Sequence, residues 1–185
     1  MAECVPFLEG VRRLAEGATV PVYVETHRNF MTTDLFFTLR LLDCFPDLKL
    51  TADLSHYVVG REFAWPIEAH NHALISRILD NAWALHGRVA SREQVQIQIS
   101  FPHHKAWLDL FMDWWAYGIR AWRKRAPADA TLTFTCELGP PEYAITGADG
   151  YELSDRWQEA QTLKDMIRNL WRKIEDETAK EANDG

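Results

Sequence analysis

The sequence has no long apolar run, and its first residues lack the basic-then-apolar order of a signal peptide. We therefore expect a cytoplasmic protein that makes no contact with a membrane. The 185 residues include three cysteines and no Cys-x-x-Cys pair, which argues against a disulfide framework and against a zinc ribbon. Cys136 directly precedes Glu137 at the end of a predicted strand. Because neighbouring strand side chains point to opposite faces, Cys136 should pack under a helix.

Basic residues are too few to suggest a nucleic-acid partner. The formal net charge is −7, whereas proteins that bind a phosphate backbone usually present a basic face. One basic cluster, formed by Arg120, Arg123, Lys124 and Arg125, surrounds Trp122. We interpret this cluster as the solvated carboxyl-terminal end of a helix, where cations interact favourably with the helix dipole. We therefore expect no nucleic acid among the partners.

No glycine-rich phosphate loop opens a predicted helix, which argues against a nucleotide-binding, doubly wound sheet. Instead, four mostly apolar β-type runs, centred near residues 23, 51, 86 and 134, alternate with helical segments. Each interval is long enough for a helical crossover, and such crossovers produce parallel sheets. The pattern predicts an α/β fold, a partial (β/α)8 TIM-type barrel of about four parallel strands, each followed by a helix. A complete barrel usually needs roughly 250 residues.

We expect one partial-barrel domain over residues 1–185. Its predicted parts are a leading helix at 1–18, four βα units at 19–175 and a polar tail at 176–185. Thr32 and Thr33 are candidate caps for a helix over LFFTLRLLDCF, and the segment around Gly60 is expected to be a loop. Half a barrel leaves two strand edges and an inner face uncovered. We therefore expect a homo-oligomer or a partner half-barrel.

Each of the four β-type runs ends on a residue that can ligate a metal. These residues are Glu25 in VPVYVETH, Asp53 in LKLTADLSH, His86 in WALHGRV and Glu137 in TLTFTCELGPP. Because the functional end of a barrel is the carboxyl end of its strands, the four side chains should form one site. Three carboxylates and one imidazole suit Mn²⁺, Mg²⁺, Co²⁺ or Zn²⁺.

The expected chemistry follows from these ligands. A divalent ion held by them could bind the carbonyl and hydroxyl oxygens of a sugar and stabilise an ene-diolate. Glu25 and Glu137, one on each side of the reacting carbon, could remove and return a proton. The residues therefore predict a metal-dependent enzyme that acts on a small-molecule sugar.

The segments VETHR, LTADLSH, LHGRV and FTCELGPPEY resemble motifs of the xylose isomerase-like TIM barrel superfamily, the sugar phosphate isomerase/epimerase proteins. The resemblance implies that Glu25, Asp53, His86 and Glu137 bind the metal. In the ketose 3-epimerase branch, a His three residues after the Asp and an Arg six residues after the His contact the substrate. The residues at those spacings are His56 and Arg92, and Arg88 of LHGRV competes with Arg92 for the second role.

The chain departs from that family in two respects. The epimerases carry a second Glu six residues beyond the first ligand, where this chain has Met31; His27 and Arg28 lie nearby and can take its place. The first four strands of the expected barrel, and half of the substrate pocket, are also absent. The resemblance thus predicts an isomerase or epimerase of a sugar or sugar phosphate, active when a partner half-barrel completes it. The alternatives are a non-catalytic assembly module and a lyase or dehydratase on a related scaffold.

Overall fold

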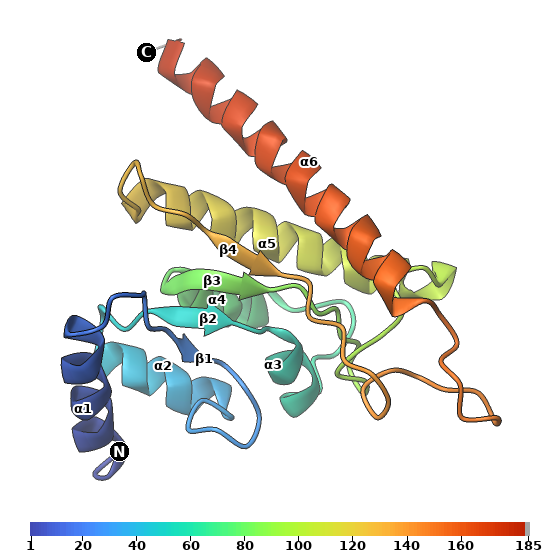
Figure 1. Cartoon of the computed structure of the whole chain (residues 1–185), viewed down its shortest axis with the longest axis horizontal. Coiled ribbons are helices and arrows are strands. Elements are labelled where there is room, and N and C mark those ends of the chain that lie inside the picture. The colour runs from blue at the N-terminus through green and yellow to red at the C-terminus, as the bar shows by residue number, and fades with distance from the viewer. Residues whose placement is uncertain (184–185) are drawn as a thin grey trace.

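A four-stranded parallel sheet forms the centre of the molecule (Figure 1). The structure is a computed structural model that describes residues 1–183. The strand order is β1-β2-β3-β4, and each neighbouring pair is parallel. The strands are β1 (Val24–Glu25), β2 (Leu50–Ala52), β3 (Ala82–His86) and β4 (Thr133–Thr135). The predicted strand positions and the predicted parallel pairing are therefore confirmed.

Six α-helices and one short 3₁₀ helix occur within the described residues. They are α1 (Cys4–Glu16), α2 (Leu35–Cys44), α3 (Ser55–Gly60), α4 (Ala69–Leu79), the 3₁₀ helix η1 (Pro102–His104), α5 (Lys105–Arg125) and α6 (Arg156–Asn183). Among the residues described, no helix combines the length and the apolar character that a membrane span requires.

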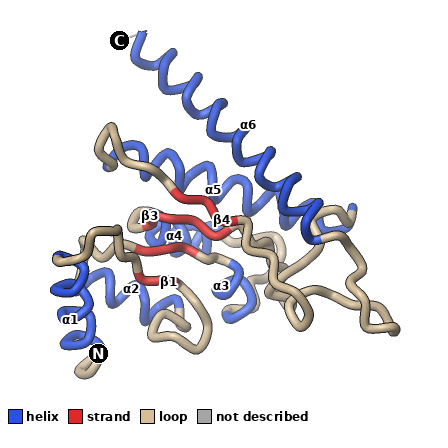
Figure 2. The backbone as a smooth tube through the Cα atoms, viewed as in Figure 1, coloured by secondary structure: helices blue, strands red, loops and turns tan. Residues whose placement is uncertain are grey.

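The main helices pack in a single layer against one face of the sheet. Crossovers of constant right hand between sequential parallel strands place their helices on the same side. In agreement, α2 contacts α4, α4 contacts α5, and α5 contacts α6 (Figure 2). The sheet residues that meet this layer are apolar: Leu50 and Leu85 are buried, and the Phe134 ring lies 5.1 Å from that of Trp115 on α5. The hydrophobic core therefore lies between sheet and helices.

The opposite face of the sheet carries the candidate ligands and is open at β4. Thr133 and Thr135 are exposed, whereas Phe134 between them is half-buried. By strand alternation, Glu137 points to the same side as the two threonines. Within the described residues, each of the edge strands β1 and β4 pairs with only one neighbour.

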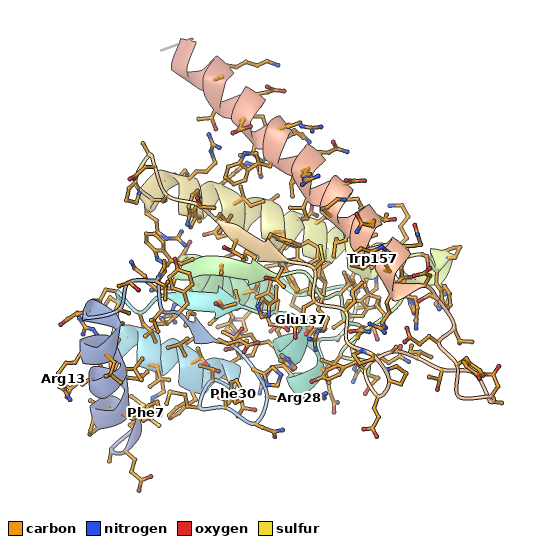
Figure 3. All side chains as sticks on the ribbon, in the orientation of Figure 1. Phe7, Arg13, Arg28, Phe30, Glu137 and Trp157 are labelled. Atoms are coloured by element: carbon orange, nitrogen blue, oxygen red, sulfur yellow. The ribbon has the colours of Figure 1, made fainter. Side chains whose placement is uncertain are left out.

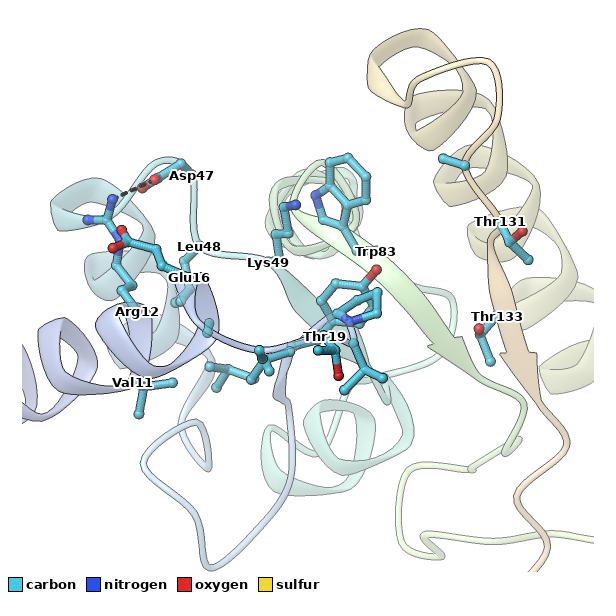
Figure 4. Close-up of a pocket in the computed structure, with 18 of the residues that line it drawn as sticks. Val11, Arg12, Glu16, Thr19, Asp47, Leu48, Lys49, Trp83, Thr131 and Thr133 are labelled. Carbon is cyan, nitrogen blue, oxygen red and sulfur yellow. Dashed lines mark hydrogen bonds and ion pairs between the residues drawn. The ribbon is translucent and has the colours of Figure 1, made fainter.

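A wide groove of about 980 Å³ lies at the amino-terminal ends of the strands (Figure 4). Helix α1, the segment 18–22 and the starts of the strands line it, with Lys49, Trp83 and Thr133 among the lining residues. The Lys49 ammonium lies over the Trp83 ring. The groove is at the other end of the strands from the candidate ligands, so it is not the predicted metal site.

Three local predictions were wrong. The segment around Gly60 was expected to be a loop, but α3 occupies residues 55–60. Helix α2 is capped by Asp34, whose carboxylate accepts from the Phe37 amide at 2.7 Å, and not by Thr32 or Thr33. The Thr32 hydroxyl instead donates to the Glu25 carbonyl and ties the loop after β1. Finally, α6 continues to Asn183, so most of the expected tail is helical.

Two other sequence interpretations were correct. The basic cluster is the carboxyl-terminal end of α5, and Arg120 pairs with Glu177 on α6 at 2.6 Å. Arg125 donates to the Ala82 carbonyl, so part of the cluster serves intramolecular contacts. Cys136 packs against the hydrophobic core, and burial raises the pKa of its thiol.

Candidate metal centre

The four predicted ligands meet at the carboxyl end of the sheet. Glu25 and His86 are the last residues of β1 and β3, Asp53 directly follows β2, and Glu137 lies two residues beyond β4. One ligand atom from each of the four side chains lies within 4.8 Å of the others. Four residues spread over 113 positions of sequence therefore form one cluster, which can hold a metal ion.

The burial and pairing of these atoms fit a cation. Asp53 is fully buried, and its Oδ2 atom has no hydrogen-bond partner. His86 Nδ1 lies 3.4 Å from Glu25 Oε1 and 2.6 Å from Glu137 Oε2. His86 Nδ1 and Glu137 Oε2 are in contact with each other, and neither atom has another hydrogen-bond partner. A buried polar atom without a partner is costly. A divalent ion would satisfy Asp53 Oδ2 and could take His86 and Glu137 as further ligands.

The protonation properties of the cluster reflect burial and close charges. Burial raises the pKa of Asp53 to about 6, although its hydrogen bond from Ser55 and the nearby Arg88 oppose the shift. The contact with His86 lowers the pKa of Glu137, and Arg88 lowers it further against the effect of burial. Burial opposes ionisation of His86, but the adjacent Glu137, with Asp53 and Glu25, raises its pKa overall. A bound cation would supply the countercharge that Asp53 lacks.

Two small hydroxyl side chains fix the position of Asp53. The Thr26 hydroxyl donates to the Asp53 carbonyl and accepts from the Asp53 amide, at 2.9 and 2.8 Å, which joins the ends of β1 and β2. The amide and hydroxyl of Ser55 both donate to Asp53 Oδ1. One carboxylate oxygen is thus engaged by the protein, and Oδ2 remains for a ligand. Such outer contacts orient metal ligands in proteins.

Arg88 holds the carboxylate of Glu137 in place through an ion pair. Its guanidinium forms an ion pair with Glu137 Oε1 and lies 3.8 Å from Asp53 Oδ2. Gln96 fixes the loop that follows Glu137, because its side-chain amide exchanges two hydrogen bonds with the backbone of Gly139, at 2.9 and 2.7 Å. The loops after β3 and β4 are therefore held together around the cluster.

The predicted substrate residues divide into two groups. His56 is buried, with Nε2 3.5 Å from Asp53 Oδ2, and its ring centroid lies 4.0 Å from that of His27. Burial, followed by His27 and Arg88, lowers the pKa of His56 to about 3, so its imidazole is neutral. Arg88 also contacts the cluster. Arg92 does not: it is exposed and pairs with Glu62 and Glu93.

The sequence analysis did not identify Thr26 and Ser55 as residues that position the site. The Tyr143 ring lies under two guanidinium groups, with centroid distances of 5.3 Å to Arg28 and 4.5 Å to Arg88. Figure 3 shows Arg28 and Glu137 toward the same end of the sheet. The short Asp-Leu-Ser spacing could have indicated Ser55, since an Asp accepts readily from the amide two residues on.

Comparisons with protein-family models, with curated proteins and with solved structures found no match to this chain. The fold and the site define a mixed α/β protein with a parallel sheet and a four-residue cluster that can hold a metal ion. The superfamily that the sequence motifs resemble stays a prediction.

Proposed function

We propose that the chain is one half of a TIM-type barrel and acts as a metal-dependent isomerase or epimerase on a sugar or sugar phosphate. The convergence of Glu25, Asp53, His86 and Glu137 carries the proposal. The sequential strand order and the single helical layer support the barrel type, since doubly wound sheets reverse their strand order and have helices on both faces. When bound, the ion would polarise the substrate carbonyl and stabilise an ene-diolate, as Mn²⁺, Mg²⁺, Co²⁺ or Zn²⁺ can do.

The residues of this chain have separate roles in the proposed reaction. One of Glu25 and Glu137 takes a proton from the carbon beside the carbonyl, and the electron pair of the C–H bond moves toward the carbonyl oxygen. The other carboxylate returns a proton to carbon. His56 is neutral and has both ring nitrogens unpaired, so it can bind a substrate hydroxyl without adding charge.

Solvent deuterium tests this mechanism. We expect Mn²⁺-loaded protein to interconvert at least one member of a ketose and ketose-phosphate panel in D₂O, with deuterium appearing at the isomerised carbon by NMR. Glu25→Gln should lose this exchange, and Glu68→Gln, a change at an exposed glutamate on the N-cap of α4, should retain it. Conversion without deuterium would contradict proton transfer. No metal-dependent conversion of any panel member, alone or with a partner present, would contradict the function.

The open sheet edges favour a second candidate function, a non-catalytic assembly module. Among the described residues, β1 and β4 each hydrogen-bond to a neighbouring strand along one edge and leave the other edge unpaired. Exposed strand edges promote association. Large apolar side chains are exposed in the segments beside both edges, among them Val22 before β1 and Leu153 and Trp157 beyond β4. A homo-oligomer or a partner half-barrel would cover these groups.

Light scattering tests the association. We expect a dimeric mass at micromolar concentration for the chain alone, if a second copy pairs with it. Trp157→Glu, on the exposed start of α6, should then shift the mass toward the monomer, whereas Lys180→Glu, far along the same helix, should not. A monomeric mass for the unaltered chain at all concentrations would exclude self-pairing and leave a different half-barrel as the expected partner.

A further inference from the structure

Two arginines and one tyrosine form a cluster beside the candidate ligands. Arg28 follows β1, Arg88 follows β3, and Tyr143 follows β4. The guanidinium carbons of Arg28 and Arg88 lie 5.3 and 4.5 Å from the centroid of the Tyr143 ring. The three side chains come from separate loops at the carboxyl end of the sheet, where barrel-type proteins bind their ligands. We call them the Arg-Tyr cluster.

Arg88 has hydrogen-bonding capacity that the protein does not use. Its side chain is 2% exposed, and its Nη1 atom has no hydrogen-bond partner. The remaining nitrogens contact the carboxylate and the carbonyl of Glu137. A buried, charged donor without an acceptor is costly. An oxyanion at Nη1 would remove that cost.

Arg28 provides a second, accessible charge. Its side chain is exposed, and no ion pair joins it to an acid among the residues described. Arg28 has the largest effect and lowers the pKa of Tyr143, burial opposes this shift, and Arg88 lowers the pKa further. The Tyr143 ring therefore lies beside two positive groups. Guanidinium forks and a hydroxyl are typical donors to phosphate and carboxylate oxygens.

The charge of the site favours an anion once the metal is bound. Three carboxylates oppose one divalent ion and the two arginines, which leaves one positive charge. With the same ion bound but without the arginines, the site would carry one negative charge and would repel an acidic substrate.

We propose that Arg28, Arg88 and Tyr143 bind an anionic group of the substrate, a phosphate or a carboxylate, next to the metal cluster. This inference rests on the proposed function, because it assigns the anion to the molecule that is isomerised. Arg88 contacts both Glu137 and the Tyr143 ring. An anion bound to the guanidinium group of Arg88 would therefore lie next to Glu137, one of the two proposed acid/base residues. The substrate class is then a short acidic or phosphorylated hydroxy-carbonyl compound, and neutral sugars are poorer substrates.

Titration of two simple anions tests the site. Inorganic phosphate and acetate are titrated by calorimetry into Mn²⁺-loaded protein. Arg28→Gln should weaken binding of the preferred anion about tenfold, since a charge-assisted hydrogen bond is lost. Tyr143→Phe, which keeps the ring but lacks the hydroxyl, should weaken it by a smaller factor. Arg92→Gln, at an exposed arginine outside the cluster, is the control and should leave the affinity unchanged.

The outcomes separate this inference from the proposed function. Equal affinities in Arg28→Gln and Arg92→Gln, or no binding of either anion, would overturn the anion site. If Arg28→Gln weakens the binding of phosphate more than that of acetate, the anionic group of the substrate is a phosphate. If it weakens the binding of acetate more, the group is a carboxylate. If the unaltered protein binds no Mn²⁺, the proposed function fails. If the unaltered protein binds Mn²⁺ but converts no ketose or ketose phosphate, the proposed function also fails, and the difference between Arg28→Gln and Arg92→Gln still decides the anion site.

Discussion

Replacement of Glu137 by glutamine should weaken Mn²⁺ binding by more than about 100-fold, because loss of an outer contact to a ligand already costs 10–100-fold. The change is nearly isosteric, so the side chain still fits its place. It removes one negative charge and replaces a strong carboxylate ligand with a weak amide. Glu137 Oε2 lies 2.6 Å from His86 Nδ1, and the four candidate ligands each place one atom within 4.8 Å of the others, so Glu137 is placed to ligate an ion there.

A nearby glutamate gives the control for this prediction. Glu142 lies five residues further along the same loop and is exposed, so Glu142→Gln should leave Mn²⁺ affinity within about twofold, as for surface changes elsewhere. Free Mn²⁺ can be counted by electron paramagnetic resonance in a titration of each variant. Equal Mn²⁺ affinity in Glu137→Gln and in the unaltered protein would show that the cluster does not hold the ion.

The four metal-ligand candidates could be predicted from the sequence because the order and direction of the strands determine which residues are neighbours. Parallel strands end at one edge, so residues at four strand ends must be neighbours. Glu25, Asp53 and His86 follow the rule directly. Glu137 lies two residues past β4, yet strand alternation still points it to the same side as Thr135.

The contacts around the cluster could not be predicted because they depend on loop conformation. Arg88 and Arg92 stand on the same short segment, and the family spacing favours Arg92, with Arg88 as its competitor. The structure places Arg88 beside Glu137, whereas Arg92 pairs with Glu62 at the surface. The Arg-Tyr cluster requires three loops to meet, which no local pattern reports. The capping of α2 was wrong for a similar reason: Thr32 is engaged with the Glu25 carbonyl and is not free to cap.

Substitution of Gly87 by alanine should destabilise the fold by about 2 kcal/mol, within the range of about 1–3 kcal/mol for an overpacked core. Gly87 directly follows His86 on β3. A Cβ atom at this position would overlap Cε1 of the Phe134 ring and lie 2.7 Å from its Cζ atom and 3.1 Å from Leu163. The Phe134 ring cannot retreat freely, because it packs edge-on against Trp115. For a chain of this size the melting temperature should fall by roughly 4–8 °C.

Gly60 provides the matched control. A Cβ atom added there has no neighbour within 4 Å, so Gly60→Ala should change the melting temperature by little, as for most surface substitutions. Because Gly87 also adjoins a candidate ligand, a shift of β3 would move His86 relative to Glu137. We therefore expect Gly87→Ala, but not Gly60→Ala, to reduce Mn²⁺ affinity as well. Unchanged stability in Gly87→Ala would mean that strand and helix layer are less closely packed than the distances indicate.

A double-mutant cycle separates the steric cause from a general effect on the backbone. Phe134→Leu removes the ring atoms that the new Cβ atom would meet, at the expected cost of a smaller core side chain. If crowding by Phe134 causes the loss, the double variant should be more stable than the two single losses would give, by about 1 kcal/mol or more for residues in contact. Strictly additive losses would assign the effect to Leu163 or to the backbone of β3. Recovery of Mn²⁺ affinity in the double variant would show that the Gly87–Phe134 contact positions His86, and would connect the packing of the helix-facing side of the sheet to the site on its other side.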